Sequence, residues 1–417
     1  MTEMNKKEKK DGVLPVFLWI FLVATVAVLL ILAATLLSRN GTFDRWRAQY
    51  KAWQEEKEAA KRAEEAGEKT VNYFGPSGIA EYESWFAGEW QDVLTNGDAL
   101  GKEEDILQTD PLREALTVSP INGTEAWWND AKKLTGSVTL YAQAETPLYG
   151  APEKNGEIFG QAMAGEAFGL FAVLENGWYV VTDGEFYYCS EGNRYTMVPL
   201  EPVDLEATFA AQEKEKVFHE VESILQKPEL PHGCEVTGLS MLLSYYGDSV
   251  DKCVLADTWL PKGAWGETDF RKAFVGDPRK TYASAGCYAT VIGDTANQYL
   301  QAEGSTLIAE SREDVTFSEL LFMVEEAPVL AWMTMELKAP YIAQVWTVDG
   351  EELYWQNYEH CVVLTGYDLE EGIFYGTDPL YGPCEYDMKL FWLRFQTMYS
   401  QVVRITEGTS LASLNRN

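Results

Sequence analysis

The stretch "LPHGCEVTGLSMLLSYYG", residues 230–247, decides how this chain is interpreted. A Gly-Cys pair precedes an apolar run with helical periodicity, and Gly247 ends the run as a C-cap. Cys234 therefore lies at the N-terminus of a predicted buried helix, where backbone N–H groups and the helix dipole favour a negative sulfur. We expect Cys234 to be a nucleophile with a lowered pKa. A disulfide or a small buried side chain are the alternatives for this cysteine.

A nucleophilic cysteine needs a base, and the chain has three histidines. His219 falls in a predicted linker helix, and the ring of His232 is expected beside the loop before Cys234. His360 opens "HCVVLTGYD", an apolar run typical of a strand, so its ring can face the helix from the end of that strand. We therefore predict that His360 is the base.

A third group must orient the imidazole, and an oxyanion needs donors. Asp378 lies in "FYGTDPLYG", on the strand predicted to pair with the His360 strand. Gln226 stands eight residues before Cys234, where its amide can act beside the Cys234 backbone N–H. The order Gln, Cys, His, Asp predicts one catalytic site.

Six segments resemble, in chain order, the peptidase-family-C-39-like domains, which are papain-fold cysteine peptidases. They are "LQKPELPHGCEVTGLSMLLSYYG" (225–247), "FVGDP" (274–278), "AGCY" (285–288), "PVLAWMTM" (328–335), "EHCVVLTGYD" (359–368) and "TDPLYG" (377–382). The resemblance implies Cys234 as nucleophile, His360 as general base and acid, Asp378 as orienter and Gln226 as oxyanion donor. It also implies a peptide or protein substrate.

An N-terminal segment predicts a membrane partner. Residues 13–38 carry no charge and are largely apolar, and about 20 such residues suffice to cross a bilayer as a helix. No small-residue cleavage pattern follows, so we expect an uncleaved signal-anchor. Lysines and arginines flank both ends equally, and the signal-like layout alone favours a cytoplasmic tail at residues 1–12 with the remainder outside the cell.

From about residue 136, short alternating runs separated by Gly, Asn and Pro predict a small β-barrel. It resembles the bacterial SH3-like domains at Leu148-Tyr149 with Pro152, at Gly165-Glu166 and at Asn176-Gly177-Trp178-Tyr179. That resemblance implies either a domain that binds cell-wall (peptidoglycan) peptides or a structural module without a ligand. Both readings stay open.

Composition excludes some functions. A formal net charge of −32 makes a nucleic-acid partner unfavourable. The six cysteines include no C-x-x-C pair, and no EF-hand pattern occurs, so we predict no metal and no cofactor. Cys361 should point into the core, away from His360, while a disulfide between Cys253 and Cys287 is possible but not predictable from spacing.

The fold class is thus predicted as α+β: a papain-like cysteine peptidase domain and a small all-β SH3-like barrel after a transmembrane helix. The expected function is a membrane-anchored extracytoplasmic cysteine peptidase at the cell surface. Its alternatives are a cell-wall binding or scaffolding protein with an inactive papain-like domain, and a peptidoglycan stem-peptide hydrolase. The predicted boundaries are 1–12 (tail), 13–38 (membrane helix), 39–70 (helical stalk), 71–135 (mostly helical, no assigned role), 136–200 (SH3-like barrel), 201–221 (helical linker), 222–405 (peptidase domain) and 406–417 (tail).

Overall fold

The computed structural model describes residues 72–74, 121, 126–129, 131–174, 177–201, 203 and 205–407. The predicted cytoplasmic tail, membrane helix and stalk lie outside the described residues, as do most of 71–135 and the last ten residues. Within the described part, no helix is both long and apolar enough to cross a bilayer.

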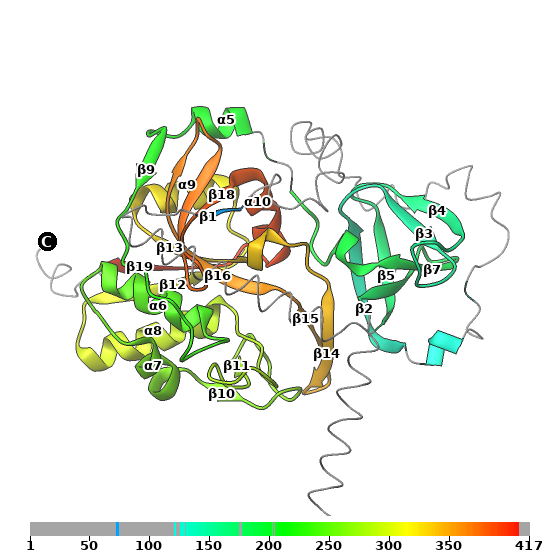
Figure 1. The fold of residues 1–417 in the computed structure, drawn as a ribbon, viewed down its shortest axis with the longest axis horizontal. Helices are drawn as coiled ribbons and strands as arrows, with labels where there is room; N and C mark the ends of the chain where they lie inside the picture. Colours follow the sequence, from blue (N-terminus) through cyan, green and yellow to red (C-terminus); the bar gives the residue numbers. More distant parts are fainter. Residues whose placement is uncertain are drawn as a thin grey trace, which may run out of the picture. The chain divides into compact units, whose positions relative to one another are not determined.

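A large sheet organises the C-terminal part of the chain (Figure 1). Its described strands follow the order β1-β18-β17-β16-β13-β19-β12, and β9 also pairs with β16. All pairings are antiparallel except the parallel β1–β18 pair. The strands are β1 (Asn72–Phe74), β9 (Lys216–Phe218), β12 (Leu307–Arg312), β13 (Val329–Thr334), β16 (Glu359–Asp368), β17 (Ile373–Asp378), β18 (Gly382–Asp387) and β19 (Val402–Glu407).

Helices cover both faces of this sheet. One core contains Trp332 and Cys361 with residues of α6 and α8, and the other contains Met333 and Val362 with residues of α9 and α10. Because β16 is buried on both faces, its sequence is a nearly continuous apolar run rather than an alternating one. The α-helices are α5 (Leu205–Ala210), α6 (Cys234–Tyr245), α7 (Lys252–Val254), α8 (Ala289–Glu303), α9 (Phe317–Glu326) and α10 (Met388–Thr397).

A second, seven-stranded antiparallel sheet forms between residues 132 and 196, in the order β4-β3-β7-β6-β5-β2-β8. The predicted β-structure of this region is therefore confirmed, while its SH3-like character stays a prediction. The strands are β2 (Lys132–Ala142), β3 (Thr146–Tyr149), β4 (Ile158–Ala162), β5 (Ala167–Val173), β6 (Trp178–Thr182), β7 (Tyr187–Glu191) and β8 (Tyr195–Thr196).

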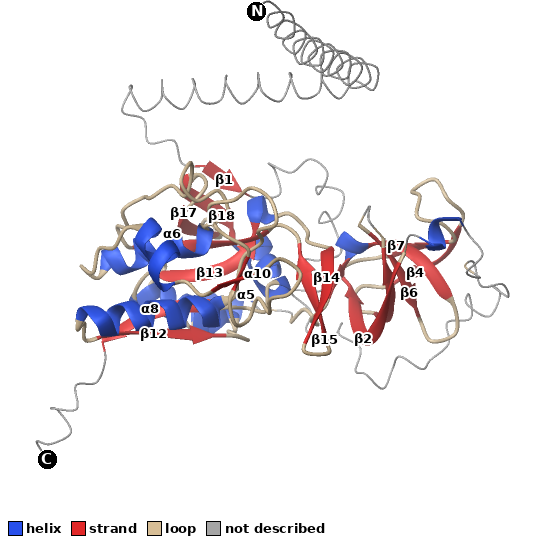
Figure 2. Cartoon of the chain, turned by 90° about the horizontal axis from the view of Figure 1, so that it is seen from below, coloured by secondary structure: helices blue, strands red, loops and turns tan. Residues whose placement is uncertain are grey.

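The remaining elements are short. A hairpin of β14 (Ile342–Val348) and β15 (Glu351–Gln356) turns at Asp349-Gly350, where both residues have positive φ, as a two-residue type I′ turn requires. Figures 1 and 2 both show this hairpin beside β2. The others are the parallel pair β10 (Lys262–Gly263) and β11 (Phe274–Val275), the 3₁₀ turns η3 (Ala126–Asn129), η4 (Gly192–Arg194) and η6 (Met335–Leu337), and the π-helical turn η5 (Leu255–Trp259).

The expected helical linker at 201–221 is wrong over part of its length. Among the described residues of this range, only Leu205–Ala210 forms an α-helix, and Lys216–Phe218 is strand β9, with the His219 backbone N–H donating to the Thr365 carbonyl. The alternating Glu and Lys before β9 imitate helical charge pairs. Val217 is buried while its neighbours are exposed, which is the period-two burial of an edge strand.

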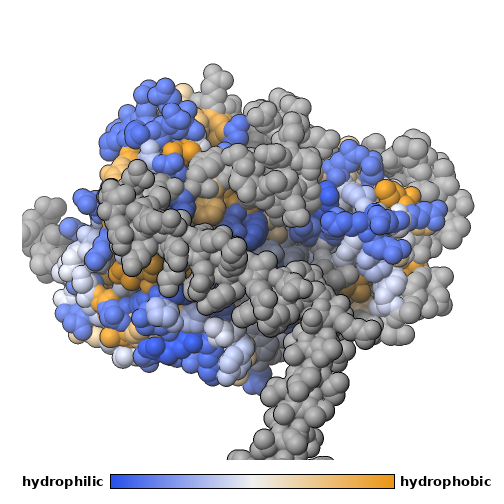
Figure 3. All heavy atoms as spheres, in the orientation of Figure 1, coloured by the Kyte–Doolittle hydropathy of each residue, from blue (hydrophilic) through white to orange (hydrophobic). Residues whose placement is uncertain are grey.

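The region 71–135, predicted to be mostly helical, instead begins with a strand, because Asn72–Phe74 forms β1. Phe74 stacks on Tyr386 of β18, at a ring separation of 5.6 Å. The partner strand lies more than 300 residues away, so local sequence carries no sign of this pairing. Among the coloured residues in Figure 3, hydrophilic ones predominate, as the acidic composition leads one to expect.

Candidate active site

Cys234 is the first residue of α6, as predicted. Gly233 is the N-cap, and a Cβ there would lie 2.6 Å from the Leu230 Cβ, so only glycine allows the chain to approach so closely. The first helical hydrogen bond runs from the Thr237 N–H to the Gly233 carbonyl. The cysteine is 7% exposed, and its side chain belongs to the core between α6 and the large sheet.

His360 and Asp378 lie in contact, as the sequence order predicts. The His360 Nε2 is 3.0 Å from the Asp378 Oδ1, and both side chains are almost fully buried. Asp378 ends β17, and it also accepts hydrogen bonds from the Leu380 backbone N–H (2.6 Å) and the Tyr386 hydroxyl (2.8 Å). Three donors therefore fix this carboxylate and, through it, the plane of the imidazole.

These contacts shift the pKa values of His360 and Asp378. Burial alone would lower the pKa of His360, but the Asp378 carboxylate and a hydrogen bond with Cys234 raise it to about 10. Burial would raise the pKa of Asp378, yet the imidazolium and the donors around it hold that pKa below its usual range. His360 is therefore an imidazolium at neutral pH. Because its Nε2 faces Asp378, Nδ1 is the ring atom left for the thiol.

The expected low pKa of the Cys234 thiol is not what the structure supports. A hydrogen bond with Cys361, burial and the nearby Glu235 carboxylate raise this pKa well above its ordinary value. The thiol donates to the Glu235 Oε2 at 3.3 Å. The helix N-terminus by itself would lower the thiol pKa. Burial and the neighbouring groups that disfavour a negative charge on the sulfur have the larger effect and raise it.

Gln226 is buried and is hydrogen-bonded to two segments, the one that follows Asp378 and the one that precedes Cys234. Its backbone N–H donates to the Pro379 carbonyl, directly after Asp378, and its side-chain Nε2 donates to the Pro231 carbonyl at 2.7 Å, three residues before Cys234. An amide nitrogen carries two hydrogens, so one remains for an oxyanion. Its Oε1 is buried without a hydrogen-bond partner among the described residues.

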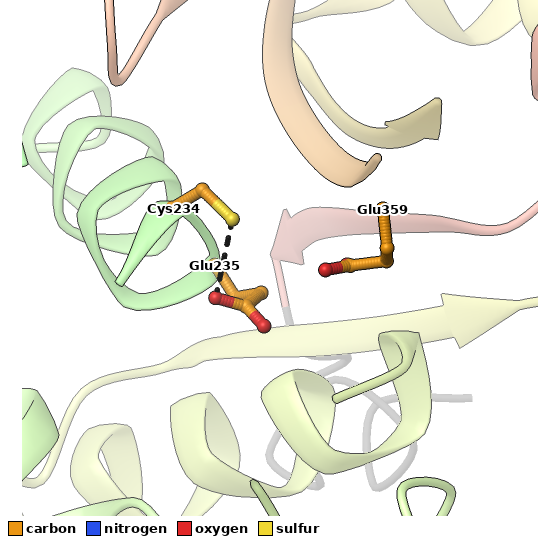
Figure 4. Close-up of side chains that lie close together, drawn as sticks. All are labelled: Cys234, Glu235 and Glu359. Carbon is orange, nitrogen blue, oxygen red and sulfur yellow. Dashed lines mark hydrogen bonds between the residues drawn. The ribbon is translucent and has the colours of Figure 1, made fainter. Parts of the chain in front are cut away.

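Two acidic residues beside the thiol were missed by the sequence interpretation. Glu235 is fully buried, and its Oε1 accepts from the Cys287 backbone N–H at 2.9 Å. Glu359 extends from the start of β16 toward the same point, as Figure 4 shows. Burial raises the pKa of Glu235 to about 7, and burial together with Glu235 raises that of Glu359 well above its ordinary value. Their one sequence signal is adjacency to Cys234 and His360.

The other cysteines and histidines complete the surroundings. Cys361 points into the core, as expected for a residue next to His360 on a strand, but that core also holds the Cys234 thiol. All six cysteines are free thiols, so Cys253 and Cys287 are not joined. The His219 ring contacts the Val324 carbonyl (2.9 Å), and burial lowers the pKa of His232. Neither residue replaces His360 beside Asp378.

Residues 214–403 match the model of the Peptidase_C39 like family. The match to this family of C39-like peptidases begins eight residues before the predicted boundary at 222 and includes β9. No curated protein matches the chain.

Three solved structures are similar to the chain. A C39-like peptidase from Bacillus anthracis is 29% identical with a TM-score of 0.43, covering 47% of this chain and 100% of that one. A double glycine motif protease from an AMS/PCAT transporter, in complex with the leader peptide, is 16% identical with a TM-score of 0.26, covering 45% and 93%. Xylellain, a cysteine protease from Xylella fastidiosa, is 10% identical with a TM-score of 0.26, covering 48% and 88%.

Proposed function

We propose that this protein is a membrane-anchored extracytoplasmic cysteine peptidase that hydrolyses peptide bonds through Cys234, His360 and Asp378. The observation that carries the proposal is the buried His360 imidazole, which is hydrogen-bonded to Asp378 and has a pKa raised by both Asp378 and the nearby Cys234 thiol. These three residues lie in the C39-like domain, which supports peptidase activity as the use of this constellation.

The reaction begins with the thiol and the imidazolium both protonated. The thiol proton passes to the Glu235 carboxylate, which already accepts its hydrogen bond, and leaves a thiolate beside the imidazolium. The sulfur attacks the scissile carbonyl carbon. The free N–H of the Gln226 amide and the Cys234 backbone N–H hold the resulting oxyanion.

Collapse of this intermediate breaks the C–N bond, and His360 gives its proton to the leaving amine. A thioester between Cys234 and the acyl group remains. The neutral His360 then takes a proton from water as the hydroxyl adds to the thioester, the acid leaves, and Glu235 returns its proton to the sulfur. Peptide and water have become acid and amine, and the enzyme has its protons back.

The proposed location and partners rest on other parts of the chain. The apolar run at 13–38 supports a single-pass anchor, with the peptidase domain outside the cell. The seven-stranded antiparallel sheet supports an SH3-like barrel that binds peptidoglycan peptides close to the membrane. Substrates are then peptides or proteins exposed at the cell surface.

Peptide cleavage by the purified full chain tests the proposal. Digestion of a proteome-derived peptide library, analysed by mass spectrometry, should yield new termini with the wild type and none with Cys234→Ala. Cys253→Ala, which changes a partly exposed cysteine outside the site, is the matched control and should cleave normally. Equal cleavage by Cys234→Ala would refute the proposed nucleophile.

A further inference from the structure

Three potential metal ligands converge where α6 meets β16. One ligand atom from each of Cys234, Glu235 and Glu359 lies within 4.8 Å of the others. Figure 4 shows the Glu359 carboxylate directed toward the other two side chains. Ligands of one zinc ion, bound at about 2.0–2.3 Å, lie about 3–4 Å apart, so a side-chain movement of about 1 Å closes the set.

Glu235 accepts hydrogen bonds from the Cys287 N–H and the Cys234 thiol, but one oxygen of Glu359 lacks the partner that a buried acid needs. Among the described residues, no Lys or Arg forms an ion pair with Glu235 or Glu359, and the buried Glu359 Oε1 accepts no hydrogen bond. Buried carboxylates are ordinarily paired, protonated or bound to a metal.

A second unpartnered group lies opposite Glu359, on the same face of the sheet. Thr334 pairs with Glu359 across β13 and β16, so their side chains share one face of the sheet. Thr334 is 0% exposed, and its hydroxyl has no hydrogen-bond partner among the described residues. A bound ion with a coordinated water would supply partners for this hydroxyl and for the Glu359 oxygen.

The backbone leaves room for the carboxylates at one glycine. A Cβ on Gly286 would lie 2.6 Å from the Glu359 Oε2 and 2.7 Å from the Glu235 Oε1. The absence of a side chain at Gly286 therefore leaves space for both oxygens. The next backbone N–H, that of Cys287, donates to the Glu235 Oε1 at 2.9 Å.

We propose that Cys234, Glu235 and Glu359 form a binding site for a thiophilic divalent cation, Zn²⁺, with the fourth position open to water. One thiolate and two carboxylates suit zinc, whereas magnesium and calcium prefer oxygen ligands alone. Binding forms a Zn–S bond as the thiol proton leaves to solvent, with no change of oxidation state. Since the metal occupies the sulfur, it blocks the nucleophile reversibly; this consequence rests on the proposed function.

Cobalt substitution tests the site without relying on activity. The full chain, stripped of metal and kept reduced, is titrated with Co²⁺ while absorbance is recorded. We expect a sulfur-to-cobalt charge-transfer band with ligand-field bands of four-coordinate Co²⁺, all removed by Zn²⁺. Cys234→Ala should abolish the charge-transfer band, and Glu359→Gln should weaken Co²⁺ binding at least about 10-fold, as loss of even an outer-shell partner often does.

Glu303→Gln makes the same chemical change on the surface end of α8 and should bind Co²⁺ like the wild type. If Glu359→Gln fails to fold, Glu235→Gln, which keeps an acceptor for the Cys287 N–H, replaces it. No charge-transfer band in the wild type would overturn the proposal. So would an unchanged band in both glutamine variants, because the thiol would then bind metal without the carboxylates. If the wild type shows the charge-transfer band but Cys234→Ala keeps its peptidase activity, the proposed function is refuted and the proposed metal site is not.

Discussion

At the scale of single residues, the proposed mechanism depends on how firmly Asp378 holds His360. The carboxylate accepts from the imidazole, from the Leu380 backbone and from the Tyr386 hydroxyl, all in a buried setting. Each donor fixes one direction of the carboxylate, so the imidazole is held in a single orientation. The tyrosine is a positioning residue, since it acts on the reaction only through Asp378.

Asp378→Asn should lower kcat by roughly 10²- to 10⁴-fold with a smaller effect on KM, because the amide cannot stabilise the imidazolium. Tyr386→Phe should lower kcat by less, since two of the three donors to Asp378 remain. Steady-state kinetics on a peptide substrate measure both effects. A larger kcat loss in Tyr386→Phe than in Asp378→Asn would contradict this order of importance.

The stability of the fold should depend on pH through Asp269, independently of catalysis. This 5% exposed carboxylate binds Arg271 through two bonds of 2.8 and 2.9 Å and also pairs with Lys272. Burial raises its pKa, but these cations lower it to about 2. A lowered folded-state pKa contributes stability above the unfolded-state pKa of about 3.9, and this stability disappears as the pH falls toward 2.

Asp269→Asn should therefore lower the free energy of unfolding by about 1–2 kcal/mol at pH 7, after allowance for solvent screening. The difference from the wild type should shrink below pH 4 and vanish near pH 2. Urea denaturation at several pH values measures it. A difference that stays constant from pH 7 to pH 3 would show that the ion pairs are not its source.

The placement of Cys234 at the start of a helix and the contact of His360 with Asp378 could be predicted because their signals are local. A Gly-Cys pair before a helix, a histidine opening a strand and an aspartate ending the next strand are each visible in short segments. Glu235 and Glu359 could not be assigned, because their convergence depends on how α6 packs on β16, and the two residues are 124 positions apart in the chain. The raised thiol pKa was missed for the same reason, since Cys361 and Glu235 act through packing.

At the scale of elements, the β14–β15 hairpin links the two sheets. Ile342 and Val345 pack in the core of the seven-stranded sheet, while Trp346 and Trp355 pack in the core that contains Cys234. The Ile342 backbone N–H donates to the hydroxyl of Tyr179 on β6, and Tyr179 is 2% exposed. The hairpin thus has one apolar face for each part of the protein.

Tyr179→Phe should lower the free energy of unfolding by about 1–3 kcal/mol, the cost of leaving the buried Ile342 N–H without an acceptor. Tyr187→Phe, a partly buried tyrosine on the neighbouring strand β7, is the matched control and should cost less. Urea denaturation followed by circular dichroism gives both values. Equal losses in the two variants would mean that the hydrogen bond to the hairpin contributes little.

Elements were predicted well where burial is one-sided or continuous along the chain, as in α6, β16 and the strands of the seven-stranded sheet. They were missed where pairing is distant. Residues 216–218 are too short and too charged to show a strand, and only the edge offered by β16 makes them one. Residues 72–74 become a strand only because β18 lies beside them.

At the scale of the whole molecule, the seven-stranded sheet and the peptidase domain share buried contacts. Besides the hairpin, the fully buried Arg394 of α10 donates to the Gln143 side chain at 3.1 Å and to the Leu337 carbonyl at 2.9 Å. A shared core of this kind predicts that the two parts unfold together. A ligand held by the seven-stranded sheet would therefore also stabilise the peptidase domain.

The proposed anchor leads to a prediction for the whole chain. Expressed in bacteria, the protein should sediment with membranes and resist extraction by alkaline carbonate, because about 20 apolar residues suffice to span the bilayer. Deletion of residues 13–38 should move it to the soluble fraction. A full chain that carbonate releases would contradict the anchor and leave the peptidase proposal unaffected.

The most direct test of the central claim is the alkylation rate of Cys234 in the full chain. Iodoacetamide labelling at neutral pH, with chelator present, is followed for each cysteine by peptide mass spectrometry in the wild type, His360→Ala and Cys361→Ala. Since the imidazolium stabilises the thiolate, we predict that Cys234 reacts faster than Cys287, which is also buried, and that His360→Ala removes this advantage. Cys361→Ala should leave the advantage intact. If Cys234 reacts no faster than Cys287, or keeps its rate without His360, then Cys234 and His360 are not a catalytic pair.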